Sequence, residues 1–318
     1  MSSSNVTFID NSTCASVTTC ETQASLRYVL GLSMAEDSAP LMAGTAVHAS
    51  LAKWFTSRGD ASAALLTLRE SYQTWADEHV PSPADRLSFN NVYRVMERWF
   101  DVHPLSSWVV RVDPALVEVG FAAPVAEDIV FVGRADAVGQ DAHGAYLLVE
   151  HKSSGRLDER WRRQHRLSAQ VTGYTWAMQQ HTNLPVVGAL VNGIELSKLP
   201  DAPRKCRVHG VQYSECGPFH AKFEAFTTQR TPEQHAEWQK TVVMLARRFM
   251  DLKNHVKGID DIKKVRTNGA FSGACANCSF ADYCNLGRPT DARTVDAMFT
   301  YAPWSPYEHA FGGHKLTE

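Results

Sequence analysis

Hydrophobic and polar positions alternate with two different periods along the chain. Three segments repeat their apolar residues at helical spacing, and they are residues 40–55, 60–78 and 84–101. From about residue 107 the period shortens to that of strands, which predicts strands over 107–112, 115–125, 128–138 and 145–152. A helical part over residues 1–105 is therefore expected to precede an α/β core over residues 106–230.

The second half of the chain returns to helices. A helix is predicted over residues 163–180, followed by strands over 186–194, 206–214 and 219–226. Thr231, Pro232 and Gln234 form a capping box with proline at the first helical position. The apolar residues behind this box step by four and three as far as Val256, which predicts one long amphipathic helix.

Neither repeats nor a convincing linker divide the chain, so a single domain over residues 1–318 is expected. The long helix and a cysteine cluster would occupy residues 231–290, and residues 291–318 would form a tail. The net charge of −2 gives no global basic field, although a local basic groove is enough to bind nucleic acid. No apolar run is long enough to span a membrane, and the N-terminus lacks a signal-peptide pattern, so the expected location is cytoplasmic.

One predicted strand ends in charged residues. Alternation places Glu150 and Lys152 on one face of the strand over 145–152 and His151 on the other. If the strand of Asp136 pairs with it as a hairpin, Asp136 lies beside Glu150, and the two carboxylates repel unless a hard divalent cation sits between them. Such a cation activates water and polarises a phosphoryl group. The alternative is a charged strand end with a surface ion pair, since an E-x-K triplet arises by chance about once in a chain of this size.

Seven cysteines are present, and three of them are closely spaced. Cys275, Cys278 and Cys284 form a C-x₂-C-x₅-C cluster near the C-terminus. In a reducing compartment this spacing favours a metal or iron–sulfur centre over disulfides.

Five motifs, in order from residue 20 to 284, resemble the RecB-like branch of the PD-(D/E)XK nuclease superfamily. They are CETQASLRYVLGL, GTAVHASL, GRADAV with LLVEHKSS, AQVTGYTWAM and CANCSFADYC. The ordered set is similar to the iron–sulfur exonucleases of this branch, which include the CRISPR-adaptation nucleases and the nuclease domain of AddB. The resemblance implies a restriction-endonuclease-like mixed β-sheet flanked by helices, with a C-terminal iron–sulfur clasp.

The resemblance also implies the residues of the active site. The implied catalytic residues are Asp136, Glu150, Lys152, Gln170 and Tyr174. The implied ligands of Mg²⁺ or Mn²⁺ are His48, Asp136, Glu150 and the backbone carbonyl of His151. Glu118 matches an acid of the preceding strand and receives no role. A lone histidine such as His48 is more often a core or surface residue, but its place in the ordered set favours the metal site.

Cys20 is expected to join Cys275, Cys278 and Cys284 around a [4Fe–4S] cluster, because it precedes Tyr28 in the register of the family motif. Cys14 fits that register less well. Four thiolates bind zinc as readily, so a zinc site is the competing interpretation. Either metal would hold the two ends of the chain together. Cys206 and Cys216 are expected to be ordinary thiols.

A run of five arginines follows the predicted metal site and suggests a track for DNA phosphates. The five are Arg156, Arg160, Arg162, Arg163 and Arg166, and Tyr174 would add a further DNA contact. Trp161 within the run either stacks on a base or packs against the protein. The alternative for the arginines is an ordinary solvated face.

The sequence therefore predicts a metal-dependent DNA nuclease, and an exonuclease acting on ends or single strands is preferred over an endonuclease. It carries no phosphate loop for ATP, so unwinding would have to come from a partner such as a helicase, and a recombinase or CRISPR integrase is an equally compatible partner. DNA repair, CRISPR adaptation and phage DNA processing are all compatible settings. The alternatives are a non-catalytic DNA-binding subunit of the same fold and a zinc-binding structural protein.

Overall fold

The chain forms two compact units in the computed structural model. The residues that the structure describes are 6–34, 38–80, 82, 85–197, 210 and 221–312. The first unit comprises Met1–Glu36, Gly120–Arg134 and Thr231–Glu318, and the second comprises Asp37–Val119 and Ala135–Arg230. Strands β3 (Arg111–Ala126) and β4 (Ile129–Gln140) contribute residues to both units.

The second unit contains a mixed β-sheet with the strand order β4-β5-β6-β7. Strand β5 (Tyr146–Ser154) runs antiparallel to β4, β6 (Val186–Glu195) runs parallel to β5, and β7 (Phe223–Gln229) runs antiparallel to β6. A parallel pair needs a crossover connection, which two helices between β5 and β6 provide. This mixed sheet flanked by helices is consistent with the predicted restriction-endonuclease-like fold.

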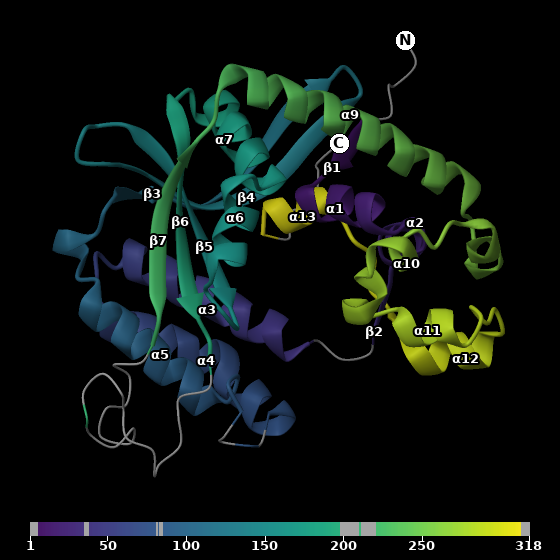
Figure 1. Cartoon of the computed structure of the whole chain (residues 1–318), viewed down its shortest axis with the longest axis horizontal. Helices are drawn as coiled ribbons and strands as arrows, with labels where there is room; N and C mark the ends of the chain where they lie inside the picture. The colour runs from purple at the N-terminus through teal and green to yellow at the C-terminus, as the bar shows by residue number, and fades with distance from the viewer. Residues whose placement is uncertain are drawn as a thin grey trace. The chain divides into compact units, whose positions relative to one another are not determined.

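Three helices precede the sheet in this unit and supply most of its apolar core. They are α3 (Ala39–Thr56), α4 (Ala61–His79) and α5 (Phe89–Val102), close to the predicted ranges (Figure 1). The side chains of Asp60 and Ser88 cap α4 and α5 by accepting from backbone N–H groups of the first turn. Trp54 and Trp99 are fully buried with ring centroids 5.1 Å apart, in one cluster with Val149 of β5.

The helix predicted over residues 163–180 is in fact two helices, so that prediction was wrong. Helix α6 spans Glu159–Arg166 and α7 spans Ala169–Thr182. Leu167 is the C-cap of α6, and Ser168 is the N-cap of α7, because its backbone is extended and its side chain accepts from the backbone N–H of Val171. The first backbone N–H groups of a new helix have no acceptor within that helix, and the N-cap serine supplies one.

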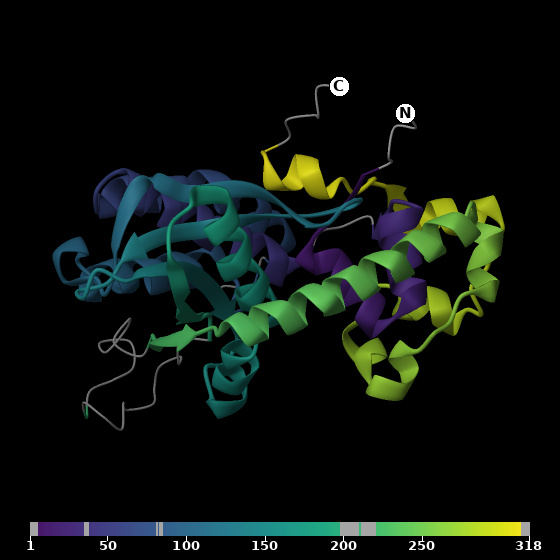
Figure 2. The ribbon, with the colours of Figure 1, turned by 90° about the horizontal axis from the view of Figure 1, so that it is seen from above.

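The first unit is built around helix α9 (Pro232–His255), which Figure 2 shows along its length. The predicted capping box is present, with the Thr231 and Gln234 side chains each accepting from the other's backbone N–H. The buried face of α9 includes Trp238, whose ring lies 4.9 Å from that of Phe131. The short strand β1 (Thr7–Ile9) pairs in parallel with the start of β4. Three helical elements follow β1: α1 (Asn11–Thr19), α2 (Glu21–Ala24) and the π-helix η1 (Ser25–Val29).

Short elements complete this unit and give it a second apolar cluster. They are β2 (Leu32–Met34), η4 (Ile259–Lys264), α10 (Gly269–Ser272), η5 (Ala274–Asn277), α11 (Ala281–Asn285), α12 (Ala292–Met298), β8 (Phe299–Tyr301) and α13 (Pro306–Ala310). Strands β2 and β8 pair antiparallel. Leu26, Ile262 and Tyr283 are fully buried in the cluster, and Cys278 and Cys284 pack against it.

One further sequence expectation differs from the structure. The strands predicted over 107–112 and 115–125 are one strand, β3, preceded by the 3-10 turn η2 (Leu105–Ser107). The strand predicted over 206–214, residue 210 excepted, lies outside the described residues, and so do Cys206 and Cys216. Within the described part of the chain, no helix combines the length and apolar character needed to cross a membrane.

Candidate active site and cysteine site

The β4–β5 hairpin brings the two predicted acids together. Its ladder pairs Ala137 with Val149, so the next step places Asp136 beside Glu150. Glu150 is 1% exposed, and its Oε1 lies 2.6 Å from Lys152 Nζ. The other oxygen of the same carboxylate is buried without a hydrogen-bond partner among the described residues. An unsatisfied buried carboxylate oxygen is costly, and a bound cation would satisfy it.

Helix α7 orients the lysine. Ser168 caps the helix, which places Gln170 in the first turn, and Lys152 Nζ donates to Gln170 Oε1 over 2.9 Å. Lys152 is therefore held between one carboxylate and one amide oxygen. The structure thus places the predicted residues Lys152 and Gln170 in direct contact.

Helix α3 brings His48 to the same site. His48 Nδ1 lies 3.2 Å from Asp136 Oδ1, and Asp136 Oδ2 accepts from the backbone N–H of His151 over 2.7 Å. A nitrogen of His48, an oxygen of Asp136 and an oxygen of Glu118 all lie within 4.8 Å of one another. Sequence reasoning assigned no role to Glu118, although it matches an acid that the family carries on the preceding strand. In the structure Glu118 lies beside the predicted ligands His48 and Asp136.

The His151 side chain has a different environment from its backbone. Its ring is 2% exposed, lies almost parallel to the Phe55 ring at 5.8 Å and has Nδ1 within 2.9 Å of Asn192 Nδ2. Burial lowers the pKa of His151 to about 4. The ring is therefore neutral, and Nδ1 accepts from Asn192. The role of the His151 carbonyl as a metal ligand stays a prediction.

The buried ionisable groups divide into two pairs. Burial lowers the pKa of His48, but the charge and hydrogen bond of Asp136 outweigh it and raise the pKa to about 9. Burial raises the pKa of Asp136, yet His48 more than offsets this and holds the pKa well below its usual range. Burial raises the pKa of Glu150, and the nearby Lys152 lowers it by less. Burial lowers the pKa of Lys152, but the Glu150 charge and hydrogen bond outweigh this and raise it. The neighbouring His48 thus favours the ionised form of Asp136, whereas burial opposes the ionised form of Glu150.

This donor set suits a hard or borderline divalent cation. Oxygens of Asp136 and Glu150 match the preference of Mg²⁺, and the imidazole of His48 also suits Mn²⁺.

The arginine run after β5 is partly neutralised by acids. Arg162 pairs with Glu224 at 2.5 Å and with Glu159 at 3.0 Å, and Arg163 pairs with the same Glu159 at 3.1 Å. Arg156 pairs with Asp158 at 3.2 Å. Arg160 and Arg166 are exposed and, within the described part of the chain, have no ion pair. These two are the arginines most available to a phosphate.

The aromatic residues predicted to meet DNA are largely buried. Trp161 is 6% exposed, and its ring packs so closely on Gly193 that a Cβ there would lie 2.5 Å from it. Trp161 therefore packs against the protein and does not present a face for base stacking. Tyr174 is 8% exposed, which leaves little of its ring for a DNA contact.

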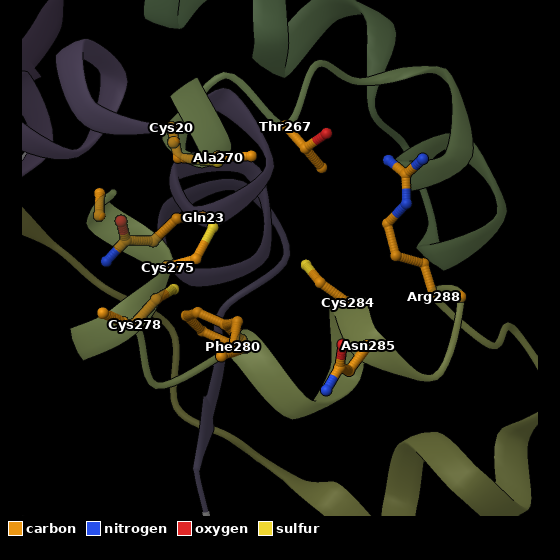
Figure 3. A pocket seen from close by; sticks show the side chains of 15 residues that line it. Cys20, Gln23, Thr267, Ala270, Cys275, Cys278, Phe280, Cys284, Asn285 and Arg288 are labelled. Atoms are coloured by element: carbon orange, nitrogen blue, oxygen red, sulfur yellow. The ribbon is translucent and has the colours of Figure 1, made fainter. Parts of the chain in front are cut away.

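The first unit gathers the four predicted cysteines around one cavity of about 600 Å³. Cys20, Cys275, Cys278 and Cys284 line it, and Figure 3 shows the sulfurs of Cys275 and Cys284 pointing into the space between them. Cys20 comes from the N-terminal segment. Of the other three, Cys275 lies in η5, Cys278 follows η5, and Cys284 lies in α11. Burial raises the pKa values of Cys278 and Cys284, with the neighbouring thiols adding to the effect.

Hydrogen bonds fasten the Cys20 segment to the segment before the cluster. Asn268 accepts from the backbone N–H of Glu21 over 2.9 Å and donates to the Thr19 carbonyl over 3.3 Å. A Cβ at Gly269 would lie 3.0 Å from Cys20 Cβ, so the close approach depends on glycine at this position. The four thiols fit a thiolate-bound metal or cluster.

Cys14 is placed differently. It is buried on α1. Burial is the main cause that raises the pKa of its thiol far above the usual range, and the negative charge of Asp10 adds to it. Among the described residues that line the cysteine cavity, Cys20 is present and Cys14 is not.

A known protein family matches most of the chain. The family model for the PD-(D/E)XK nuclease superfamily matches residues 11–285, and the chain belongs to this superfamily. Membership implies a metal-dependent nuclease. No curated protein matches. Among solved structures, the chain is similar to that of SSO0001, with 14% identity, coverage of 75% of this chain and 84% of that one, and a TM-score of 0.34. The family assignment therefore rests on the family model.

Proposed function

We propose that the protein is a divalent-metal-dependent deoxyribonuclease that removes nucleotides from DNA ends or single strands. The observation that carries the proposal is the buried Glu150 oxygen without a partner, next to Asp136 and Lys152. The ordered motifs shared with RecB-like exonucleases support the choice of an exonuclease.

The residues of the site would have different roles. Asp136, Glu150, His48 and the His151 carbonyl would hold Mg²⁺ or Mn²⁺, which when bound activates water and polarises the phosphoryl group. Lys152, fixed by Gln170 at 2.9 Å, would orient the attacking water and offset charge on the phosphate. Gln170 is a positioning residue in this scheme because it reaches the site through Lys152.

The cysteine cavity supports a [4Fe–4S] cluster held by Cys20, Cys275, Cys278 and Cys284. Four thiolates bind zinc equally well, so zinc is the competing metal. The order and register of the cysteine motifs, which resemble those of the iron–sulfur exonucleases, favour the cluster. The cluster would join distant parts of the chain and would take no part in hydrolysis.

DNA is the proposed partner, approached through the arginines of α6 and the loop before it. A helicase, recombinase or CRISPR integrase is the proposed protein partner. ATP-driven unwinding would come from a helicase, since the sequence carries no ATP-binding phosphate loop.

The test incubates anaerobically purified protein with end-labelled linear single- and double-stranded DNA, and with circular single-stranded DNA, in Mg²⁺ or Mn²⁺. We expect linear DNA to be degraded from its ends, circles to survive, and EDTA to stop the reaction. Cleavage of the circles would replace the exonuclease assignment by an endonuclease. Failure to cut any substrate in either metal would contradict the nuclease.

A further inference from the structure

Glu118 occupies an unusual backbone position for its residue type. It lies inside strand β3 with a φ of 53°, in the left-handed region that non-glycine residues rarely adopt. Strain of this kind persists only where the surroundings enforce it, and in strands it bends the backbone and redirects a side chain. The redirected carboxylate lies within 4.8 Å of ligand atoms of both His48 and Asp136.

Three ligand atoms gather around Asp136. Asp136 Oδ1 faces His48, and an oxygen of Glu118 completes a group of three. Glu150 is not one of the three: its Oε1 contacts Lys152, and its buried Oε2 has no partner among the described residues. Glu118 is therefore the acid that the structure adds to the His48–Asp136 pair.

We infer that Glu118 is a further protein ligand of the divalent cation held by His48 and Asp136. This inference rests on the proposed metal-dependent function. One imidazole and two carboxylates form a set that suits Mn²⁺, with Mg²⁺ bound less tightly at the nitrogen-containing position. The strained backbone of Glu118 is then the conformation that aims its carboxylate at the cation.

The test measures binding of Mn²⁺ alone, by the electron paramagnetic resonance signal of free Mn²⁺, without DNA. Glu118→Gln preserves the side-chain shape and removes the charge, and Glu97→Gln on the exposed face of α5 is the matched control. We expect Glu118→Gln to weaken Mn²⁺ binding by about 10-fold or more, as loss of metal-site partners typically does. Glu97→Gln should bind as the wild type does.

A second variant separates the ligand role from a structural one. Glycine adopts positive φ without strain, so Glu118→Gly should melt in EDTA at or above the wild-type temperature and yet gain less thermal stability from added Mn²⁺. Wild-type Mn²⁺ affinity in both Glu118 variants would overturn the inference and leave the proposed nuclease intact. A wild-type protein that binds no Mn²⁺ would overturn the proposed function and the inference together.

Discussion

At the scale of single residues, the site combines features that sequence shows with others that only the fold shows. Asp136, Glu150 and Lys152 could be assigned because strand alternation and a hairpin fix their face and register. Glu118 could be matched to an acid of the preceding strand, but its approach to His48 and Asp136 could not be predicted, because it accompanies a left-handed backbone conformation inside a strand. The burial of Trp161 could not be predicted from the sequence either. It depends on the absence of a side chain at Gly193, which lies on the later strand β6.

The His48–Asp136 pair predicts a pH dependence of stability in metal-free protein. The pKa of His48 is raised to about 9 in the folded state, above the ordinary 6.5 of an unfolded histidine. The stabilisation is therefore complete below pH 6.5 and is lost as the pH rises towards 9. In EDTA, the melting temperature of wild type relative to that of His48→Asn should fall over this range. A constant difference between the two proteins from pH 6 to 9 would show that the pair does not form.

Gln170 predicts a loss of rate without a loss of fold. Gln170→Ala removes the acceptor that holds Lys152 Nζ, so single-turnover cleavage should slow by about 10-fold or more, since misplacement of a catalytic group costs rate. The melting temperature and DNA affinity should change little. Gln164→Ala, an exposed residue of α6, is the control and should cut normally. A normal rate in Gln170→Ala would remove its positioning role.

At the scale of elements, periodicity predicted long helices and strands well and their interruptions poorly. The capping box of α9 was confirmed because its residues are local in sequence. The break between α6 and α7 was missed, although Ser168 carries an N-cap signal, because the apolar pattern continues across it. The result is a short basic helix that follows the candidate site and has an acid of its own at the N-terminal end.

Helix α6 predicts unequal roles for its arginines in DNA binding. Arg163 is already paired with Glu159, whereas Arg160 has no ion pair in the described part of the chain. Arg160→Ala should therefore weaken DNA binding and reduce the slope of log affinity against log salt by about 0.7 to 0.9, the change expected for one phosphate contact. Arg163→Ala should have a smaller effect. Equal effects in a salt titration would show that the ion pair does not matter for binding.

At the scale of the whole molecule, the cysteine site links segments that are distant in sequence. Cys20 and Cys284 are separated by more than 260 positions, yet both line one cavity. The family motif order predicted this grouping, and local pattern could not have done so. The bonds of Asn268 to the segment around Cys20 show that the segments also meet through the protein itself.

The cluster predicts a coloured protein whose colour depends on four particular cysteines. Anaerobically purified wild type should be brown, and Cys20→Ala or Cys278→Ala should bleach it and lower its melting temperature, because the cluster closes a long loop. Cys14→Ala should keep the absorption, since Cys14 is buried away from the cavity lining. A colourless protein with one equivalent of zinc would establish the competing metal. Bleaching in Cys14→Ala with retention in Cys20→Ala would disprove the choice of fourth ligand.

The buried Glu150 carboxylate at the end of β5 is proposed to support metal-dependent hydrolysis of DNA. Single-turnover cleavage by Glu150→Gln tests this role most directly. The comparison uses linear DNA, saturating Mg²⁺ and the exposed Glu127→Gln as control. We predict a loss of about 10³-fold in Glu150→Gln with DNA binding retained, since metal polarisation contributes several kcal/mol and each 1.4 kcal/mol is tenfold in rate. The Glu127→Gln rate should equal that of wild type. A folded Glu150→Gln protein that cuts DNA at the wild-type rate would contradict the account.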